Sequence, residues 1–308
     1  MIHETFQTVE GQLNWKAPMY KLYEKAKKNG KWDPTELDFT KDKMDFDNMT
    51  EDEKVTVVPL VSYFSAGEEA VTLDILPMAQ AMAKQGRLED TIYLTTFMFD
   101  EAKHTELFSR WQHVVGIGDM DISVFHNDNY KRIFYEKLPS SMNRLNTDDS
   151  PSAVIRAATV YNMVVEGILA ETGYYAFRQI FKTANLLPGI LQGIDYLNQD
   201  EGRHLQFGIY TIQRLITGSE ENSKVFNDFM EELWPDAIGA IEHLTSLYEL
   251  QMAQEWAKSS LVLDPEEIKQ YAKKQYDIRR RQVNKARSFA SSVALDEATS
   301  KAIERSEY

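Results

Sequence analysis

The same five-residue pattern occurs twice in this chain, and it limits what the fold can be. Residues 100–104 and 200–204 both spell Asp-Glu-x-basic-His. In an α-helix, residues three apart lie about 60° from each other around the axis and about 4.5 Å apart along it. The Glu and His of each pattern can therefore bind one ion together, and the repetition predicts two ions held by two helices.

The chain has 308 residues and no cysteine, which excludes disulfides, thiolate metal sites and cysteine nucleophiles. Any metal must therefore be held by nitrogen and oxygen. The net charge of -14 argues against nucleic acid or an anionic membrane as the main partner, because both select a basic surface. The N-terminus has no signal-peptide pattern, and no apolar run reaches the length of a membrane span. We therefore expect a cytoplasmic protein.

Apolar residues recur mainly at helical spacing, which predicts an all-α protein. The expected helices cover residues 50–85, 88–115, 150–184, 187–217, 220–259 and 264–290, with less regular structure over 119–149. We expect Pro77 to kink the first helix. Helices of roughly 30 residues joined by short turns favour a ferritin-like four-helix bundle with additional flanking helices. We treat residues 1–308 as one domain whose C-terminal helix and tail begin near 264, with the basic residues of 273–287 on its solvated face.

Two further glutamates stand isolated in apolar or small-residue surroundings, where an unpaired carboxylate is costly. Glu68 lies in the first expected helix and Glu166 in the third. Glu69 points about 100° away from its neighbour, so we expect it to be an ordinary surface acid. The resulting order, Glu, Glu-x-x-His, Glu, Glu-x-x-His on four successive helices, is typical of ferritin-like di-metal carboxylate proteins. The predicted metal ligands are Glu68, Glu101, His104, Glu166, Glu201 and His204.

The charges and donor types of this set indicate which ions it suits. Four carboxylates balance two divalent cations, and oxygen and imidazole donors favour iron or manganese. Ligand histidines usually donate their other ring N–H to a carboxylate. We therefore expect Asp200 to hold His104 and Asp100 to hold His204, the alternative being that both aspartates are surface acids. We expect the other histidines, such as His113, His126 and His243, to be structural, because they have no matching acid partner.

With these residues in place, the chain resembles the ribonucleotide reductase small-subunit superfamily, and within it the ligand-binding oxidases. The resemblance covers residues 6–287 and is carried by the runs 65–77, 95–104, 155–167 and 191–210. It implies an oxidase with a manganese/iron cofactor assembled with dioxygen, di-iron being possible. It also implies a long-chain fatty acid bound at the metals, a valine–tyrosine ether cross-link and a homodimer.

The resemblance also assigns residues. The positions matching the cross-linked pair are Val71 and Tyr161, which sequence physics alone would place in the core. By the same resemblance the first ion, taken as manganese, is held by Glu68, Glu101 and His104. The second ion, taken as iron, is held by Glu166, Glu201 and His204. Glu101 is then the expected bridge.

Two other functions stay open at this point. A true reductase small subunit passes an oxidising equivalent to a large subunit, and its usual radical tyrosine lies one turn after the first motif histidine. Phe108 occupies that position here, which removes the tyrosyl radical but leaves a metal-based oxidant possible. The second alternative is a ferritin-like iron-binding protein. The physiological substrate is not indicated by the sequence.

Overall fold

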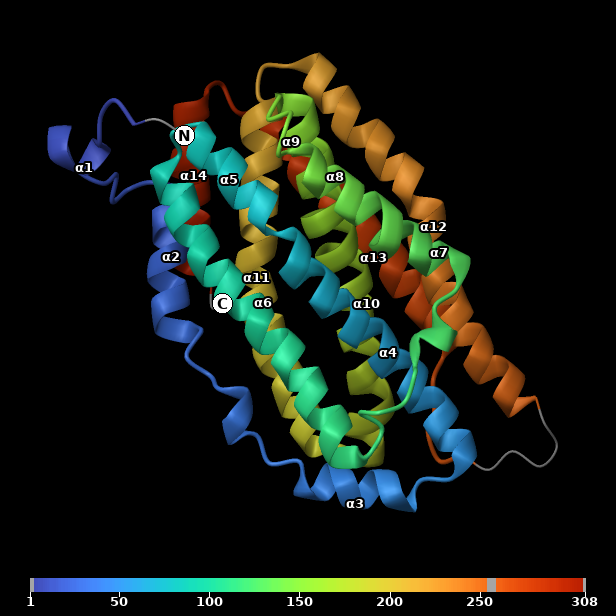
Figure 1. The fold of residues 1–308 in the computed structure, drawn as a ribbon. Coiled ribbons are helices and arrows are strands. Elements are labelled where there is room, and N and C mark those ends of the chain that lie inside the picture. Colours follow the sequence, from blue (N-terminus) through green and yellow to red (C-terminus); the bar gives the residue numbers. More distant parts are fainter. Residues whose placement is uncertain (1–2, 254–258, 307–308) are drawn as a thin grey trace.

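Four long helices form the core, and the remaining helices pack around them (Figure 1). The structure is a computed structural model that describes residues 3–253 and 259–306. The core helices are α4 (Glu51–Asp74), α6 (Leu88–Val115), a composite helix over residues 151–182 and α11 (Pro188–Ile216). Within the described ranges there is no strand. The predicted all-α, ferritin-like bundle is therefore confirmed.

The composite helix changes its hydrogen-bonding pattern along its length. It consists of α9 (Pro151–Ala158), η4 (Thr159–Ala170), α10 (Glu171–Phe177) and η5 (Arg178–Lys182), of which η4 and η5 are π-helical. In a π-helix the backbone bonds join residues five apart instead of four. The helix is long and apolar enough to cross a membrane, but 83% of its apolar window is buried inside the protein. It is the central helix of the core.

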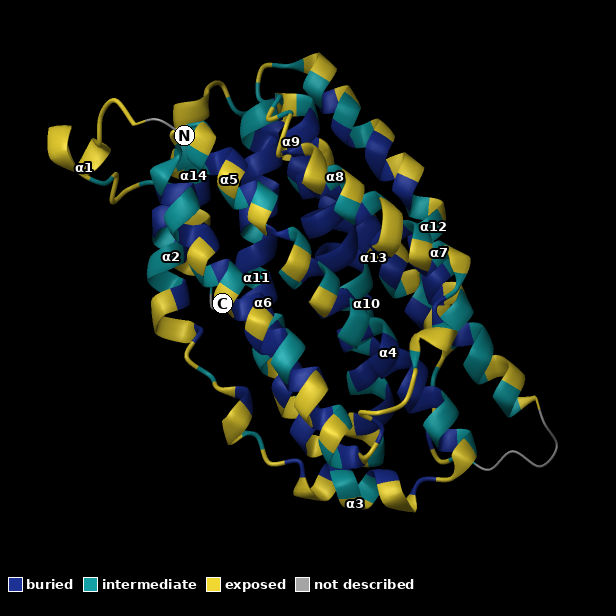
Figure 2. Ribbon diagram, in the orientation of Figure 1, coloured by how far each residue is buried: buried dark blue, intermediate teal, exposed yellow. Residues whose placement is uncertain are grey.

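The remaining helices cover the bundle from several sides. On one side α12 (Glu220–Met252) and α13 (Pro265–Asn284) pack on η4, while α2 (Pro18–Asn29) packs between α6 and α14 (Ser292–Arg305). Figure 2 shows buried residues facing the interior and exposed ones outside. The other short elements are α1 (Gln7–Glu10), η1 (Pro34–Glu36), α3 (Thr40–Asn48), α5 (Leu76–Lys84), η2 (Ser123–Phe125), α7 (Asp128–Lys131), η3 (Arg132–Lys137), α8 (Leu138–Arg144) and η6 (Lys285–Ser288).

Local sequence signals fix where the core helices begin and end. Thr50 and Glu53 form a reciprocal capping box at the start of α4. Gly116 ends α6 in a left-handed conformation with a φ of 86°, which glycine adopts without a Cβ penalty. The start of α11 is capped from another element, since Asp42 of α3 accepts bonds of 2.7 and 2.8 Å from the amides of Gly189 and Ile190. These contacts set the register of the helices.

Several expected boundaries are wrong. The helix expected over 50–85 is two helices separated at Ile75, and Pro77 lies in the first turn of α5, where its missing N–H costs nothing. The stretch 119–149 contains α7, η3 and α8. The helix expected to reach 259 ends at Met252, and 254–258 lie outside the described residues. The expected tail contains α14. No helix was predicted before residue 50, where α2 has a clear apolar stripe and α3 only a weak one.

The basic run at 273–287 is not entirely a solvated face. Arg279 is buried, and its Nε donates to the carbonyl oxygen of Gly167 in η4 over 3.1 Å. Lys273 instead forms an exposed ion pair with Asp277 one turn later on α13. The interior arginine thus ties α13 to the core helix, because it satisfies a carbonyl that π-helical bonding leaves available.

Candidate metal centre

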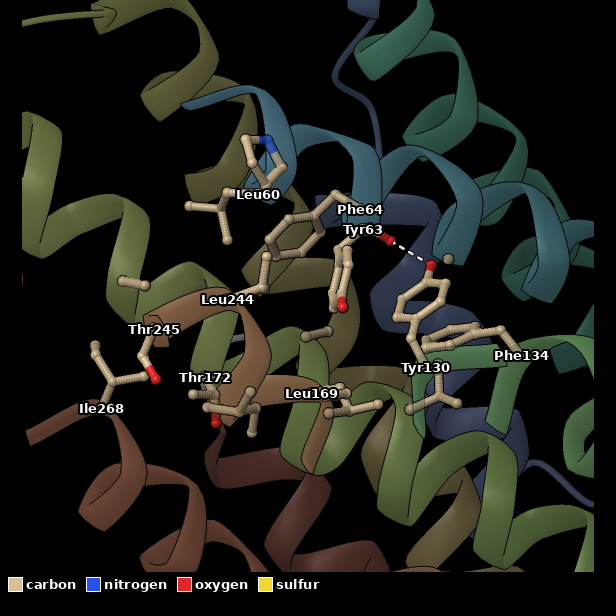
Figure 3. A pocket seen from close by; sticks show the side chains of 18 of the residues that line it. Leu60, Tyr63, Phe64, Tyr130, Phe134, Leu169, Thr172, Leu244, Thr245 and Ile268 are labelled. Carbon is tan, nitrogen blue, oxygen red and sulfur yellow. Dashed lines mark hydrogen bonds between the residues drawn. The ribbon is translucent and has the colours of Figure 1, made fainter. Parts of the chain in front are cut away.

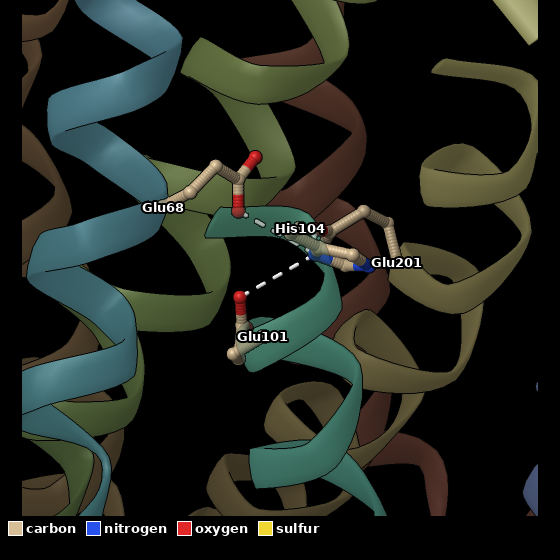
Figure 4. Close-up of side chains that lie close together, drawn as sticks. All are labelled: Glu68, Glu101, His104 and Glu201. Carbon is tan, nitrogen blue, oxygen red and sulfur yellow. Dashed lines mark ion pairs between the residues drawn. The ribbon is translucent and has the colours of Figure 1, made fainter. Parts of the chain in front are cut away.

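The structure brings all six sequence-predicted ligand residues together in the middle of the bundle. One comes from α4, one from η4 and two from each of the motif helices α6 and α11, and all are buried. They form two overlapping groups whose ligand atoms lie within 4.8 Å of one another. The first group is Glu68, Glu101, His104 and Glu201 (Figure 4), and the second is Glu101, Glu166, Glu201 and His204. The two motif glutamates belong to both groups.

Each histidine turns its Nδ1 toward the carboxylates. His104 Nδ1 lies 3.4 Å from Glu68 Oε2, 3.5 Å from Glu101 Oε2 and 3.6 Å from Glu201 Oε1. In the same way, His204 Nδ1 lies 3.4 to 3.5 Å from oxygens of Glu101, Glu166 and Glu201. Such distances are too long for good hydrogen bonds. They leave the space in which a cation bonded to all of these atoms would lie.

The inward-facing atoms lack other partners. Glu101 Oε2, Glu166 Oε1, Glu201 Oε2 and the Nδ1 atoms of His104 and His204 are buried without a hydrogen bond. Buried polar atoms are normally paired, and a cluster of unpaired ones indicates a site for a bound ion. Four carboxylates with two imidazoles are a suitable donor set for two iron or manganese ions. The residues therefore fit a di-metal cofactor.

The electrostatics of the site lead to the same conclusion. Burial raises the pKa of the carboxyls of Glu68 and Glu166, and repulsion from Glu201 adds to this effect. Burial alone would lower the pKa of His104, but bonds to the surrounding carboxylates outweigh it and hold that pKa well above its usual value. Without cations the cluster thus retains protons. Metal binding would displace them, so metal affinity should rise with pH.

The outer ring nitrogens meet the two motif aspartates. His104 Nε2 lies 3.3 Å from Asp200 Oδ2, and His204 Nε2 lies 3.5 Å from Asp100 Oδ2. The contact of His104 with Asp200 is thus a hydrogen bond, as the repeat predicts, whereas His204 Nε2 faces Asp100 without a hydrogen bond. Trp32, which the sequence did not single out, donates its Nε1–H to Asp200 Oδ2 over 2.7 Å.

The basic residues of the two motifs have a role that sequence reasoning missed. Lys103 and Arg203 are buried, and each pairs with both aspartates. Lys103 Nζ lies 2.9 Å from Asp100 and 3.2 Å from Asp200, and Arg203 lies 2.9 Å from Asp100 and also contacts Asp200. The two cations offset two anions, so the aspartates remain charged acceptors for the histidines. The repeated basic position was the available signal.

Tyr161 and Glu166 both face the site because η4 is π-helical. Residues five apart in an α-helix point about 140° away from each other, whereas π-helical bonding brings them to one face. The Tyr161 hydroxyl lies 3.1 Å from the backbone oxygen of Val71 and 3.1 Å from Glu101 Oε1. Asn162, also missed from sequence, donates to Glu166 Oε2 over 2.7 Å. The predicted valine–tyrosine pair is thus adjacent to the ligands.

An apolar cavity extends from the ligands between α4, α10, α12 and α13 (Figure 3). Its inner end is lined by Glu68, Glu166, Glu201 and Val71, and its outer end by Tyr248 and Leu263. Along α4 the lining extends from Val71 to Val55, sixteen positions that span about 24 Å of helix. The cavity therefore joins carboxylates at one end to a long apolar wall.

Other residues singled out from sequence lie away from the ligands. Glu69 and His113 are exposed, and His243 is half-buried. His126 is buried against α4, with its Nε2 3.0 Å from Ser62 Oγ, as expected for a structural histidine. Phe108 is buried and stacks on Phe64. None of these five residues belongs to either ligand group.

Helices in this arrangement, with a buried site of four glutamates and two histidines, define a ferritin-like di-metal carboxylate protein. The family model for the small chain of ribonucleotide reductase matches residues 14–293. The chain belongs to this family.

Solved structures narrow the similarity. An R2-like ligand-binding oxidase with an aerobically reconstituted Mn/Fe cofactor is 61% identical, with a TM-score of 0.88 over 92% of this chain and 98% of that one. A variant of such an oxidase, with a tyrosine replaced by phenylalanine and an anaerobically reconstituted Mn/Fe cofactor, is 60% identical. It has a TM-score of 0.86 over 92% of this chain and 99% of that one. These similarities support an oxidoreductase with a di-metal site.

Proposed function

We propose that this protein is a dioxygen-activating oxidase with one manganese and one iron ion. The observation that carries the proposal is the pair of ligand groups that share both motif glutamates, in a chain similar to Mn/Fe oxidases. The manganese would be held by Glu68, Glu101 and His104, the iron by Glu166, Glu201 and His204, with Glu101 as the bridge. When bound, such a pair supplies electrons to dioxygen and becomes a strong oxidant. Two iron ions would fit the same donors.

The first product of this oxidant would be an ether bond between Tyr161 and Val71. The phenol oxygen would bond to the valine Cβ, and the O–H and Cβ–H hydrogens would leave as two protons and two electrons, with dioxygen as the acceptor. Two contacts support this step. The Tyr161 hydroxyl already touches the Val71 residue at its backbone oxygen, and it donates to Glu101, which can take its proton. Both side chains are buried, so water is kept away.

A long-chain fatty acid is the ligand that best matches the cavity. Its apolar wall suits an acyl chain, and the inner end places the carboxylate beside the metal ligands. If both ions become trivalent, they carry a surplus of +2 over the four glutamates, and an anionic ligand reduces that surplus. The homodimer and cytoplasmic location implied by the resemblance stay predictions.

Peptide mass spectrometry tests the proposed chemistry. Protein loaded with manganese(II) and iron(II) is digested after exposure to air or after anaerobic handling. We expect a fused species containing Val71 and Tyr161, lighter by two hydrogens than the separate peptides, in the aerobic sample only. Separate peptides from protein whose metals have oxidised would instead favour a reductase small subunit with a metal-based oxidant. Repeated uptake of many iron ions per chain would favour the ferritin-like alternative.

Extraction of the loaded protein with organic solvent tests the ligand. We expect one long-chain fatty acid per chain, identified by mass spectrometry. Protein that carries both metals but releases no fatty acid contradicts this part of the proposal and leaves the cross-link unaffected.

A further inference from the structure

A second buried tyrosine contacts the ligand set. Tyr174 of α10 is fully buried, and its hydroxyl makes a long hydrogen bond of 3.4 Å to Glu201 Oε1. Tyr161 makes the corresponding contact with Glu101 Oε1 over 3.1 Å. The glutamates they touch are the two that belong to both ligand groups. Each of the two shared glutamates is therefore contacted by the hydroxyl of one tyrosine.

A stack of aromatic rings leads to Tyr174. Phe64 stacks on the Tyr174 ring with a centroid distance of 5.1 Å and an angle of 20°, and Phe108 stacks on Phe64 at 5.3 Å. The preceding residue, Gly173, leaves room for this stack, since a Cβ there would lie 2.4 Å from Phe64. Burial, with the nearby carboxylates, raises the pKa of Tyr174 well above its usual value. The phenol is therefore shielded from solvent.

We propose that Tyr174 is a second redox-active tyrosine, which supplies one electron to the oxidised metal centre when Val71 and Tyr161 cannot react. The electron leaves the ring, the O–H proton moves along the hydrogen bond to Glu201 Oε1, and a neutral phenoxyl radical stays on the protein. This step rests on the proposed function, because the oxidant is the Mn/Fe pair after its reaction with dioxygen. Tyr174 is second because its bond is 0.3 Å longer than that of Tyr161, which also has a valine to join.

The test blocks the cross-link and then removes the second phenol. Tyr161→Phe protein is loaded with manganese(II) and iron(II), mixed with dioxygen, frozen at intervals and examined by electron paramagnetic resonance. We expect an organic radical whose hyperfine pattern narrows when ring-deuterated tyrosine is incorporated. The double variant Tyr161→Phe/Tyr174→Phe should lose the signal. The matched control, Tyr161→Phe/Tyr93→Phe, should keep it, because the Tyr93 hydroxyl is equally buried but has no hydrogen-bond partner.

Four outcomes overturn the proposal. A radical that survives in Tyr161→Phe/Tyr174→Phe, or that disappears in the Tyr93 control, assigns it to another residue. If the metals of the Tyr161→Phe protein oxidise and no radical forms, Tyr174 is not oxidised. The proposed function would still hold in that case, provided that the parent protein forms its cross-link. A parent protein that binds both metals but forms no cross-link and does not react with dioxygen contradicts the proposed function, and the proposal about Tyr174 with it.

Discussion

Replacing Lys103 by methionine tests the buried charge network behind the metal ligands. Methionine keeps the length and apolar stem of lysine but removes the charge that lies within 3.2 Å of both Asp100 and Asp200. Arg203 and the two histidines then face the two buried carboxylates without the lysine. Removing one partner of a buried ion pair costs about 3–5 kcal/mol because a buried charge is left uncompensated. The variant also loses the hydrogen bond that Lys103 Nζ donates to the Gly30 carbonyl, and the free-energy cost of this loss is included in the same range.

The cost should depend on pH in a defined direction. Burial opposes ionisation of Asp100 and Asp200, but bonds from the histidines and the two cations hold the pKa of both carboxyls below their usual value. A depressed pKa stabilises the folded state above the unfolded carboxyl value of about 3.9, and this contribution is lost as the pH falls below it. The difference between parent and Lys103→Met should therefore be largest at neutral pH and shrink below about pH 4.

The measurement is denaturant unfolding of metal-free protein in the presence of a chelator, at pH 7 and at a series of lower values. Lys43→Met is the control, because the Lys43–Asp47 pair on α3 is exposed and contributes only about 0.3–0.5 kcal/mol. A loss below about 1 kcal/mol for Lys103→Met, equal to an ordinary surface pair, would refute the reasoning. A loss that grows on acidification would do the same.

Three further changes have defined outcomes. Asp200→Asn should weaken metal affinity about 10- to 100-fold, measured by competition with a chelating dye, because His104 loses its charged acceptor. Gly173→Ala should destabilise the fold by about 1–3 kcal/mol in thermal unfolding and lower the fatty-acid content, because its Cβ would displace Phe64 from the cavity wall. Asp42→Ala should cost about 2–4 kcal/mol in denaturant unfolding, since it leaves two α11 amides and a buried indole N–H unpaired.

Each of these changes has a matched control. Asp195→Asn lies on the same helix as Asp200 but on the exposed surface, and should leave metal affinity unchanged. Gly11→Ala adds a methyl group with ordinary contacts, and Asp47→Ala removes an exposed acid of α3, so both should shift stability by less than about 0.5 kcal/mol. Equal effects in a variant and its control would contradict the corresponding explanation.

The core helices could be predicted because their boundaries depend on local signals. The capping box at Thr50 and the glycine at 116 need no information from the rest of the chain. The start of α11 shows the limit of such reasoning, since its cap is Asp42, almost 150 positions earlier in the chain. The short helices α2 and α3 are held by packing against long ones. The weak apolar pattern of α3 did not reveal it, whereas the apolar stripe of α2 was an available signal.

The ligand set could also be predicted, because isolated acids in apolar helices are costly unless they serve a purpose. What surrounds the ligands could not. The bonds of Trp32 to Asp200 and of Tyr174 to Glu201 join residues that are distant in sequence, and each residue alone is indistinguishable from ordinary core. The placement of Tyr161 beside the site depended on π-helical bonding, for which the sequence gives no periodic signal.

The π-helical segment η4 makes the candidate metal centre sensitive to the number of residues in one helix as well as to their identity. Deleting a position that lies in η4 but outside 161–166, such as Ile168, would allow ordinary α-helical bonding while Tyr161 and Glu166 remain five positions apart. These two side chains would then point about 140° away from each other and lose their common face. A surface turn such as 117–121 can absorb an insertion or a deletion. We therefore expect functional relatives to vary in length at such turns and to have no length change of this kind in this helix.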